Sequence, residues 1–179
     1  MKVAITGHTR GIGKSIWEYF ISKGNHCIGY SRTNGYNILN DIVKQKIVAE
    51  SKDSDIFVNN ACSYTDHSQL TILKNIWEEW KDCPEKIIIN ISSEAGDLVD
   101  NPSYPHKAYA IQKHQQDEFC RTHTSGPWII NLKPGLVDTD SVRGRLGSKM
   151  SPEVFKKILE VILDSKEDFK IRTVTFQLF

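Results

Sequence analysis

The eight residues from Thr6 to Gly13, Thr-Gly-His-Thr-Arg-Gly-Ile-Gly, constrain the fold of this chain more than any other stretch. They follow a short apolar run and precede an amphipathic one, so they predict a strand, a tight turn and a helix. Gly7 lets the backbone reverse sharply, Gly11 lets the main chain approach a ligand, and Gly13 lets the helix pack closely on the strand. The free N–H groups and the positive dipole end of that helix favour a diphosphate. We interpret the stretch as a dinucleotide-binding turn; the alternative is a purely structural turn.

Composition limits which classes of protein this chain can belong to. The chain has 179 residues, 39% of them hydrophobic and 25% charged, which predicts one domain over residues 1–179. A net charge of +1 without a basic cluster gives no indication of a nucleic-acid partner or a membrane surface. No apolar run is long enough to cross a bilayer, and the N-terminus lacks a signal-peptide layout. Four widely spaced cysteines predict reduced thiols in a cytoplasmic protein, and the six histidines show no metal-ligand spacing.

Apolar runs that are typical of strands alternate with helical patterns along the chain, which predicts an α/β fold with a parallel sheet. The predicted strands cover residues 3–5, 27–30, 35–38, 55–58, 86–91, 127–132 and 171–176. The predicted helices cover residues 11–23, 39–51, 66–81 and 107–122, and a further helix starts at Ser151. Large side chains recur along the helix over 66–81 at helical spacing. Core packing explains them best, and a contact with a partner subunit is the alternative.

Two arginines indicate which dinucleotide is bound. Ser31 and Arg32 follow the strand over 27–30, at the point where a dinucleotide fold meets the adenosine ribose. Arg10 lies just before Gly11 and is a second candidate for the same phosphate. The planar guanidinium suits a 2′-phosphate, so the pair favours NADP, with NAD possible. Alternatively, both arginines are solvated loop residues. Asn37 is a candidate partner for the adenine amino group, as is Asp41.

Three polar side chains form the candidate catalytic group. Ser93 follows a continuous apolar strand, so it lies at the carboxyl edge of the sheet, where ligands bind in such folds. Tyr109 and Lys113 are four residues apart and share one helix face. A nearby ammonium lowers the pKa of a phenol from its usual value of about 10, so Lys113 is expected to tune Tyr109 as a proton donor. Ser93 would then donate to a substrate carbonyl. The alternative is an ordinary Tyr/Lys pair on an exposed helix.

Taken together and in order, these motifs resemble those of the short-chain dehydrogenases/reductases. That family carries Thr-Gly-x-x-x-Gly-x-Gly, Asn-Asn-Ala-Gly, a catalytic serine after the fifth strand, Tyr-x-x-x-Lys and Pro-Gly-x-Val-x-Thr. The resemblance implies the catalytic residues Ser93, Tyr109 and Lys113. It also implies that the cofactor is held by Gly7, Thr9, Arg10, Gly11, Ile12, Gly13, Ser31, Arg32, Asn37, Asn59, Asn60, Ala61, Tyr109, Lys113, Pro134, Gly135, Val137 and Thr139.

The resemblance further implies a single-domain Rossmann-type doubly wound sheet, strand order 3-2-1-4-5-6-7, with helices on both faces. It implies a small carbonyl or alcohol substrate, and a homodimer or homotetramer formed through the helices over 66–81 and 107–122. The sequence departs from the family in several places. There is room for only about one helix between Asn60 and Ser93, Cys62 replaces a glycine, and the lid segment is cut to about 140–150. The usual catalytic asparagine has no clear counterpart, because Asn75 lies too close to Ser93 in sequence.

Two alternatives to a carbonyl reductase remain at this stage. The first is a non-catalytic NADP-binding sensor or scaffold of the same fold, which the short chain and the missing asparagine favour. The second is another reaction on this fold, such as epimerisation or dehydration of a nucleotide sugar. We rank the second last, because the short C-terminal region leaves little room for a bulky nucleotide.

Overall fold

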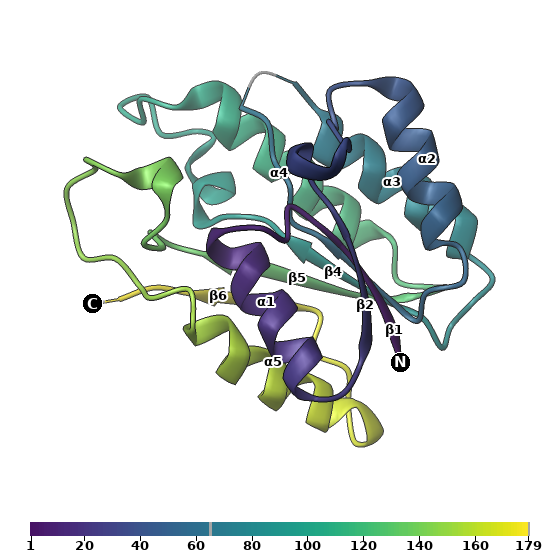
Figure 1. Cartoon of the computed structure of the whole chain (residues 1–179). Coiled ribbons are helices and arrows are strands. Elements are labelled where there is room, and N and C mark those ends of the chain that lie inside the picture. Colours follow the sequence, from purple (N-terminus) through teal and green to yellow (C-terminus); the bar gives the residue numbers. More distant parts are fainter. Residues whose placement is uncertain (65, 179) are drawn as a thin grey trace.

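The computed structural model describes residues 1–64 and 66–178, in which strands and helices alternate as Figure 1 shows. The strands are β1 (Lys2–Thr6), β2 (His26–Tyr30), β3 (Ile56–Asn59), β4 (Ile87–Ile91), β5 (Trp128–Pro134) and β6 (Thr173–Phe176). The helices are α1 (Gly11–Ser22), α2 (Asp41–Ser51), α3 (Ser68–Trp80), α4 (Lys107–Thr122) and α5 (Val154–Asp164). Short 3₁₀ segments are η1 (Arg32–Asn34), η2 (Glu94–Leu98), η3 (Asp140–Val142) and η4 (Ser165–Glu167).

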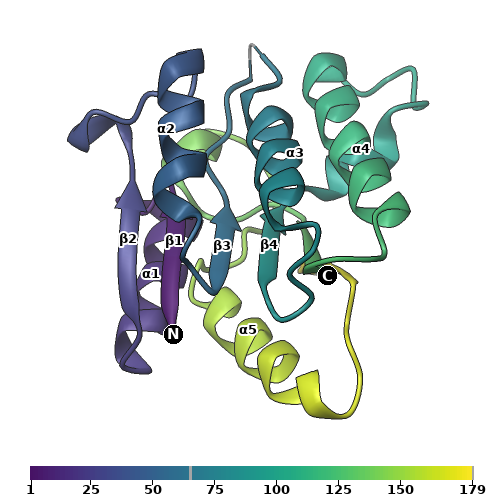
Figure 2. The same cartoon turned by 90° about the vertical axis from the view of Figure 1, so that its right-hand side faces the viewer.

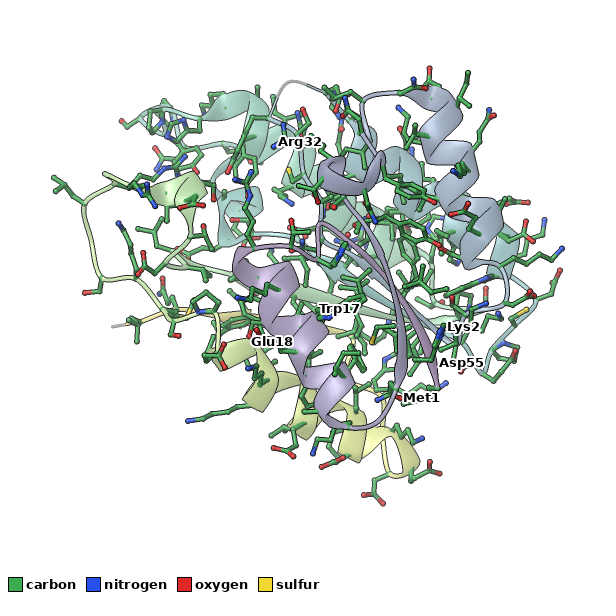
Figure 3. All side chains as sticks on the ribbon, viewed as in Figure 1. Met1, Lys2, Trp17, Glu18, Arg32 and Asp55 are labelled. Atoms are coloured by element: carbon green, nitrogen blue, oxygen red, sulfur yellow. The ribbon has the colours of Figure 1, made fainter. Side chains whose placement is uncertain are left out.

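The strands form one parallel sheet in the order β2-β1-β3-β4-β5-β6. Because every strand runs the same way, all carboxyl ends meet at one edge of the sheet. Figure 3 shows Arg32 beyond that edge, whereas Met1, Lys2 and Asp55 lie at the opposite end. The backbone N–H of Lys2 donates to Asp55 Oδ2 there, at 2.7 Å. The predicted Rossmann-type doubly wound sheet is confirmed.

Helices cover both faces of the sheet. Helices α1 and α5 pack side by side on one face, and α2, α3 and α4 lie on the other, as Figures 1 and 2 show. A hydrophobic core lies on each face of the sheet, and successive strand residues point into opposite cores. Val58 and Ile89 face the α1/α5 layer, while Phe57 and Ile88 face the α2/α3 layer. This double coverage explains why the central strands read as unbroken apolar runs.

The predicted third strand over residues 35–38 is wrong, so the sheet has six strands in the described residues and lacks the expected edge strand. The backbone groups of this segment hydrogen-bond to neighbouring residues in the sequence and not to another strand. The side chain of Asn34 accepts from Ser31 N and donates to Gly29 O, both at 2.8 Å. Gly35 then adopts φ +90°, and Tyr36 N returns to Ser31 O at 2.8 Å. This tight turn leads the chain directly into α2 instead of along β2.

The large side chains of α3 pack inside the molecule. They are buried against the sheet and α2, with the exception of Trp77, which meets Phe119 of α4 edge to face at 6.1 Å. The fully buried members of the stripe are Leu70, Leu73, Ile76 and Trp80. Core packing, the first of the two interpretations, therefore accounts for this stripe.

Candidate functional site

The glycine turn has the geometry of a phosphate cradle. Gly7 and Gly11 adopt positive φ angles of +72° and +55°. A Cβ on Gly13 would overlap the carbonyl oxygen of Gly7 and lie 2.5 Å from Asn60 Nδ2. Helix α1 begins at Gly11 without a side-chain cap and without an acidic residue in its first turn. Its first N–H groups therefore have no acceptor of their own in the cap, which fits a bound diphosphate.

Thr6 and Asn60 brace this turn from behind. The Asn60 amide donates to Thr6 O at 3.0 Å and to Gly7 O at 3.3 Å. The Thr6 hydroxyl accepts from the backbone N–H groups of Asn60 and Ala61 at 2.9 and 3.0 Å, and donates to Val58 O. The end of β3 is thus tied to the end of β1, and these hydrogen bonds stabilise the shape of the loop.

A cleft of about 940 Å³ opens along the carboxyl edge of the sheet, beside this turn. It brings together most of the residues that the sequence assigned to the site. Those that line it are Gly7, Thr9, Arg10, Gly11, Ile12, Ser31, Arg32, Asn37, Asn60, Ala61, Ser93, Tyr109, Lys113, Pro134, Gly135, Val137 and Thr139.

Gly13 and Asn59 do not line the cleft. Gly13 lies beneath the turn, where it permits the close packing described above. Asn59 is fully buried, and its amide donates to Gln69 O at 3.0 Å and to Asn90 Oδ1 at 2.9 Å. Asn90 in turn donates to Asn131 Oδ1 at 2.9 Å, so the three amides form a ladder across β3, β4 and β5. The structure thus places the Asn59 side chain in buried contacts behind the cleft, and its assignment to the cofactor stays a prediction.

The end of the cleft beside β2, where the sequence predicts the adenosine, carries the two arginines. Arg32 is exposed at the start of η1, and Arg10 is mostly exposed, with one loose contact to Asp140 at 3.9 Å. Both guanidinium groups therefore remain available to a phosphate. The Ser31 hydroxyl is already engaged with Thr33 Oγ1 at 2.7 Å. Asn37 lines the same region, whereas its alternative, Asp41, pairs with Lys44 outside the cleft.

Ser93, Tyr109 and Lys113 meet at the other end. Ser93 follows β4, and its side chain caps η2 by accepting from Ala95 N at 3.2 Å. The Ser93 hydroxyl also lies within hydrogen-bonding reach of the Tyr109 side chain, and it donates to Pro134 O at 3.5 Å. Lys113 is 2% exposed, and its Nζ lies 5.5 Å from the centre of the Tyr109 ring. Helix α4 presents Tyr109 and Lys113 on one face, one turn apart, as their spacing requires.

The electrostatics of this group differ from the expectation. Burial raises the pKa of Tyr109 above its usual value, the Cys62 side chain adds to the rise, and the hydrogen bond from Ser93 opposes it. Burial lowers the pKa of Lys113, against the influence of Cys62 and Asp117. The predicted lowering of the Tyr109 pKa by Lys113 is therefore wrong for this arrangement. Desolvation is the largest influence on the pKa of each group, because both are taken out of water.

Sequence reasoning missed one residue in contact with this group. Gln69, near the start of α3, accepts from Lys113 Nζ at 2.7 Å. Asn75, the asparagine considered from the sequence, does not line the cleft. The sequence pattern could have identified Gln69. It shares the buried face of α3 with the apolar Leu73 and Ile76, and a polar side chain on such a face needs a hydrogen-bond partner.

The remaining wall of the cleft lies beside Ser93 and Tyr109. Cys62 and Tyr64 line it after β3, and Tyr104 lines it from the loop before α4. The shortened segment after Thr139 contributes residues 140–142, 145 and 146. Cys62 faces the cleft where the resemblance implies a glycine, so its side chain narrows this part of the cleft.

The described residues carry neither a metal-binding cluster nor a membrane-spanning helix. No group of three histidine, cysteine, aspartate or glutamate side chains there is arranged to hold a metal ion. None of the helices in that part of the chain has the length and hydropathy needed to span a membrane. The four cysteines carry free thiols.

Comparisons with known proteins agree on the fold. No protein-family model matches this chain, and no curated protein sequence matches it either. Solved structures do match. A 3-alpha-hydroxysteroid dehydrogenase from Pseudomonas sp. B-0831, complexed with NADH, superposes with a TM-score of 0.74 at 15% identity, over 99% of this chain and 95% of the other.

Two more solved structures extend the comparison. A short-chain dehydrogenase from Burkholderia cenocepacia J2315, in complex with NADP, gives a TM-score of 0.75 at 15% identity, over 97% of this chain and 86% of the other. A short-chain dehydrogenase/reductase from Vibrio parahaemolyticus gives 0.75 at 17% identity, over 98% of both chains. The chain therefore has the fold of the short-chain dehydrogenases/reductases.

Proposed function

We propose that this chain is an NADP-dependent oxidoreductase of the short-chain dehydrogenase/reductase family, which interconverts a ketone or aldehyde and an alcohol. The observation that supports this most is a single cleft with the glycine cradle at one end and Ser93, Tyr109 and Lys113 at the other. In this proposal residues 1–179 form one dinucleotide-binding domain.

The residues that line the cleft fit a nicotinamide dinucleotide. The cradle would hold the diphosphate, Arg10 and Arg32 the 2′-phosphate, and Lys113 the ribose hydroxyls. Asn37 would bind the adenine, and the segment from Pro134 to Thr139 would hold the carboxamide. When bound, the nicotinamide would supply the hydride that carbonyl reduction requires.

The proton comes from the chain's own residues. Ser93 donates a hydrogen bond to the carbonyl oxygen of the substrate and so fixes its position. Tyr109 then gives its phenolic proton to that oxygen as negative charge develops on it. The raised pKa of Tyr109 keeps the phenol protonated at neutral pH, so the donor is ready before substrate arrives. The phenolate that remains is stabilised by Ser93 and by the Lys113 ammonium until solvent returns a proton.

Steady-state assays of NADPH oxidation with a panel of small ketones and aldehydes test this proposal. Turnover that Tyr109→Phe abolishes would support it. Tight NADPH binding without turnover on any member of the panel would favour the non-catalytic sensor or scaffold instead. A chain with no measurable affinity for NADPH or NADH would overturn both.

We also propose that the protein forms a homodimer or homotetramer. The apolar stripe of α3 is used inside the molecule, so α4 is the better candidate for the contact. Ile111 of α4 is 42% exposed and lies between Tyr109 and Lys113 in sequence. Light scattering coupled to size-exclusion chromatography would decide: a monomer at micromolar concentration contradicts the proposal.

A further inference from the structure

Gln69 occupies the centre of a buried polar group behind the candidate catalytic residues. It is the second residue of α3 and is 2% exposed. Its Nε2 donates to Asn59 O and to Ile91 O, both at 2.9 Å. Its Oε1 accepts from Lys113 Nζ at 2.7 Å and from Gln116 Nε2 at 3.2 Å. Both donors and both lone pairs of the amide are therefore satisfied.

These contacts leave the amide one orientation. The carbonyl oxygens of Asn59 and Ile91 can only accept, so Nε2 must face them. Oε1 must then face Lys113, and exchanging the two ends would bring oxygen against oxygen and nitrogen against ammonium. Because the two carbonyls belong to neighbouring strands, the sheet itself aims the Gln69 oxygen at Lys113.

The Lys113 ammonium is hydrogen-bonded by Gln69 and by the neighbouring backbone of β4. Its Nζ also donates to Ile91 O at 2.9 Å, so two of its three N–H bonds are committed to Gln69 and the backbone of β4. The third is left for the cleft that Lys113 lines. Two fixed acceptors at the end of a long, flexible side chain determine where its charge lies.

The ionisable groups around Lys113 are few. Cys62 faces it from the loop after β3, and Tyr109 and Asp117 face it from α4. The Asp117 carboxylate is engaged elsewhere, with Ser92 at 2.6 Å and with Lys133 at 3.0 Å. In contrast to a carboxylate, the Gln69 amide accepts a hydrogen bond without adding charge.

We propose that Gln69 is a positioning residue: its side-chain amide fixes the Lys113 ammonium beside Tyr109 and stabilises its charge without pairing it to an anion. This inference rests on the proposed function for its catalytic meaning. The catalytic asparagine that the resemblance implies is thus replaced, at the start of the corresponding helix, by a glutamine that contacts the lysine directly.

The first experiment measures the pKa of Lys113 without cofactor, by NMR of protein with isotope-labelled lysine. Gln69→Met has a similar length but no strong acceptor, so the Lys113 pKa should fall by about one to two pH units. Gln69→Glu keeps an acceptor toward Lys113 and adds a charge, so that pKa should rise, at a cost in stability because its second oxygen faces the carbonyls of Asn59 and Ile91. Gln116→Met is the matched control. It removes a buried amide from the same group that makes no hydrogen bond to Lys113 among the described residues, and it should leave that pKa unchanged.

The second experiment measures the pH profile of kcat. Loss of the Lys113 charge should make kcat fall at alkaline pH, and we call the midpoint of this fall the alkaline limit. Gln69→Met should move the alkaline limit to lower pH. It should also lower kcat about 10- to 100-fold. Gln69→Glu should move the limit to higher pH. The KM for NADPH should change less than kcat, because the cradle and the two arginines are untouched.

Two results would overturn the inference. One is a folded Gln69→Met protein whose Lys113 pKa and alkaline limit match those of Gln116→Met. The second applies if Gln69→Met does not fold. In that case an unchanged Lys113 pKa in Gln69→Glu would overturn the inference. If the wild-type protein turns over no carbonyl substrate, the proposed function fails, while the NMR measurement still decides whether Gln69 controls Lys113.

Discussion

The rings of Tyr64 and Tyr109 lie 5.0 Å apart, tilted by 48°, at the substrate end of the cleft. Two phenols thus border the same space. Tyr64 is 48% exposed and belongs to the loop after β3, whereas Tyr109 is carried by α4 and hydrogen-bonded by Ser93. Only Tyr109 combines a fixed position with a neighbouring hydroxyl and a neighbouring ammonium. Removing the hydroxyl group of each tyrosine in turn therefore tests which of the two is the proton donor.

Tyr109→Phe should lower kcat for carbonyl reduction by about 10²- to 10⁴-fold, the usual contribution of a general acid. Tyr64→Phe keeps the ring contact and should lower kcat by less than about tenfold. The affinity for NADPH, measured by fluorescence titration, should survive in both variants. Equal losses of kcat in the two variants would remove Tyr109 from its assigned role.

The Tyr109 phenol should ionise only at a pH above its usual value of about 10, because burial disfavours the phenolate. Subtracting the ultraviolet titration of Tyr109→Phe from that of the wild-type protein isolates this group. The sign for stability follows from the raised pKa. The folded state holds the proton more tightly, so the contribution is fully present below about pH 10 and is lost as pH rises through the folded value. A difference titration centred below pH 10 would contradict this.

Gly13→Ala should disrupt the cradle. The added Cβ would overlap the Gly7 carbonyl oxygen, which is backbone and cannot easily move aside. We expect the free energy of unfolding to fall by about 1–3 kcal/mol, as in other overpacked sites, and NADPH binding to be lost. The neighbouring Lys14→Ala change affects an exposed side chain of the same helix and serves as the control. Urea unfolding and cofactor titration measure both effects. Unchanged NADPH affinity in Gly13→Ala would argue against a cradle at this turn.

Arg32→Asp should shift the cofactor preference from NADPH toward NADH. A charge-assisted hydrogen bond to the 2′-phosphate would be lost and a repulsion gained, so the Kd for NADPH should rise about 10- to 100-fold or more. The Kd for NADH should change little. Arg121→Gln is a matched control, because Arg121 is exposed and pairs with Glu118 at 2.7 Å on α4, outside the cleft. If the ratio of the two affinities stays constant, Arg32 does not contact the phosphate.

Asn59→Ala tests whether Asn59 acts in the buried core or at the cofactor. The change removes the hydrogen bonds to Gln69 O of α3 and to Asn90 Oδ1 of β4, and it leaves Asn90 with an unpaired acceptor. The free energy of unfolding should fall by about 2–4 kcal/mol, whereas the NADPH affinity of the folded protein should change less than about threefold. A large loss of affinity without a loss of stability would return Asn59 to the cofactor site.

The sequence by itself determined the features that depend on neighbouring residues. The glycine turn, the helix that follows it and the boundaries of α4 are local, because backbone freedom and side-chain periodicity act over a few residues. The continuous apolar run of β4 also placed Ser93 at the carboxyl edge. These features were enough to predict the fold class, whereas most of the residues that line the cleft were predicted from the resemblance to a known family.

Only the tertiary structure decided the features that depend on contacts between distant segments. The expected edge strand over 35–38 was replaced by a turn, because Asn34 and Gly35 satisfy the backbone locally. Asn59 and Asn60 are adjacent in the sequence, yet one is buried in the sheet and the other braces the glycine turn, since successive strand residues point to opposite sides. Gln69 and Lys113 are 44 positions apart, and their contact exists only because α3 and α4 pack on the same face of the sheet. Burial at that contact, which no sequence pattern reports, also sets the direction of the pKa values of Tyr109 and Lys113.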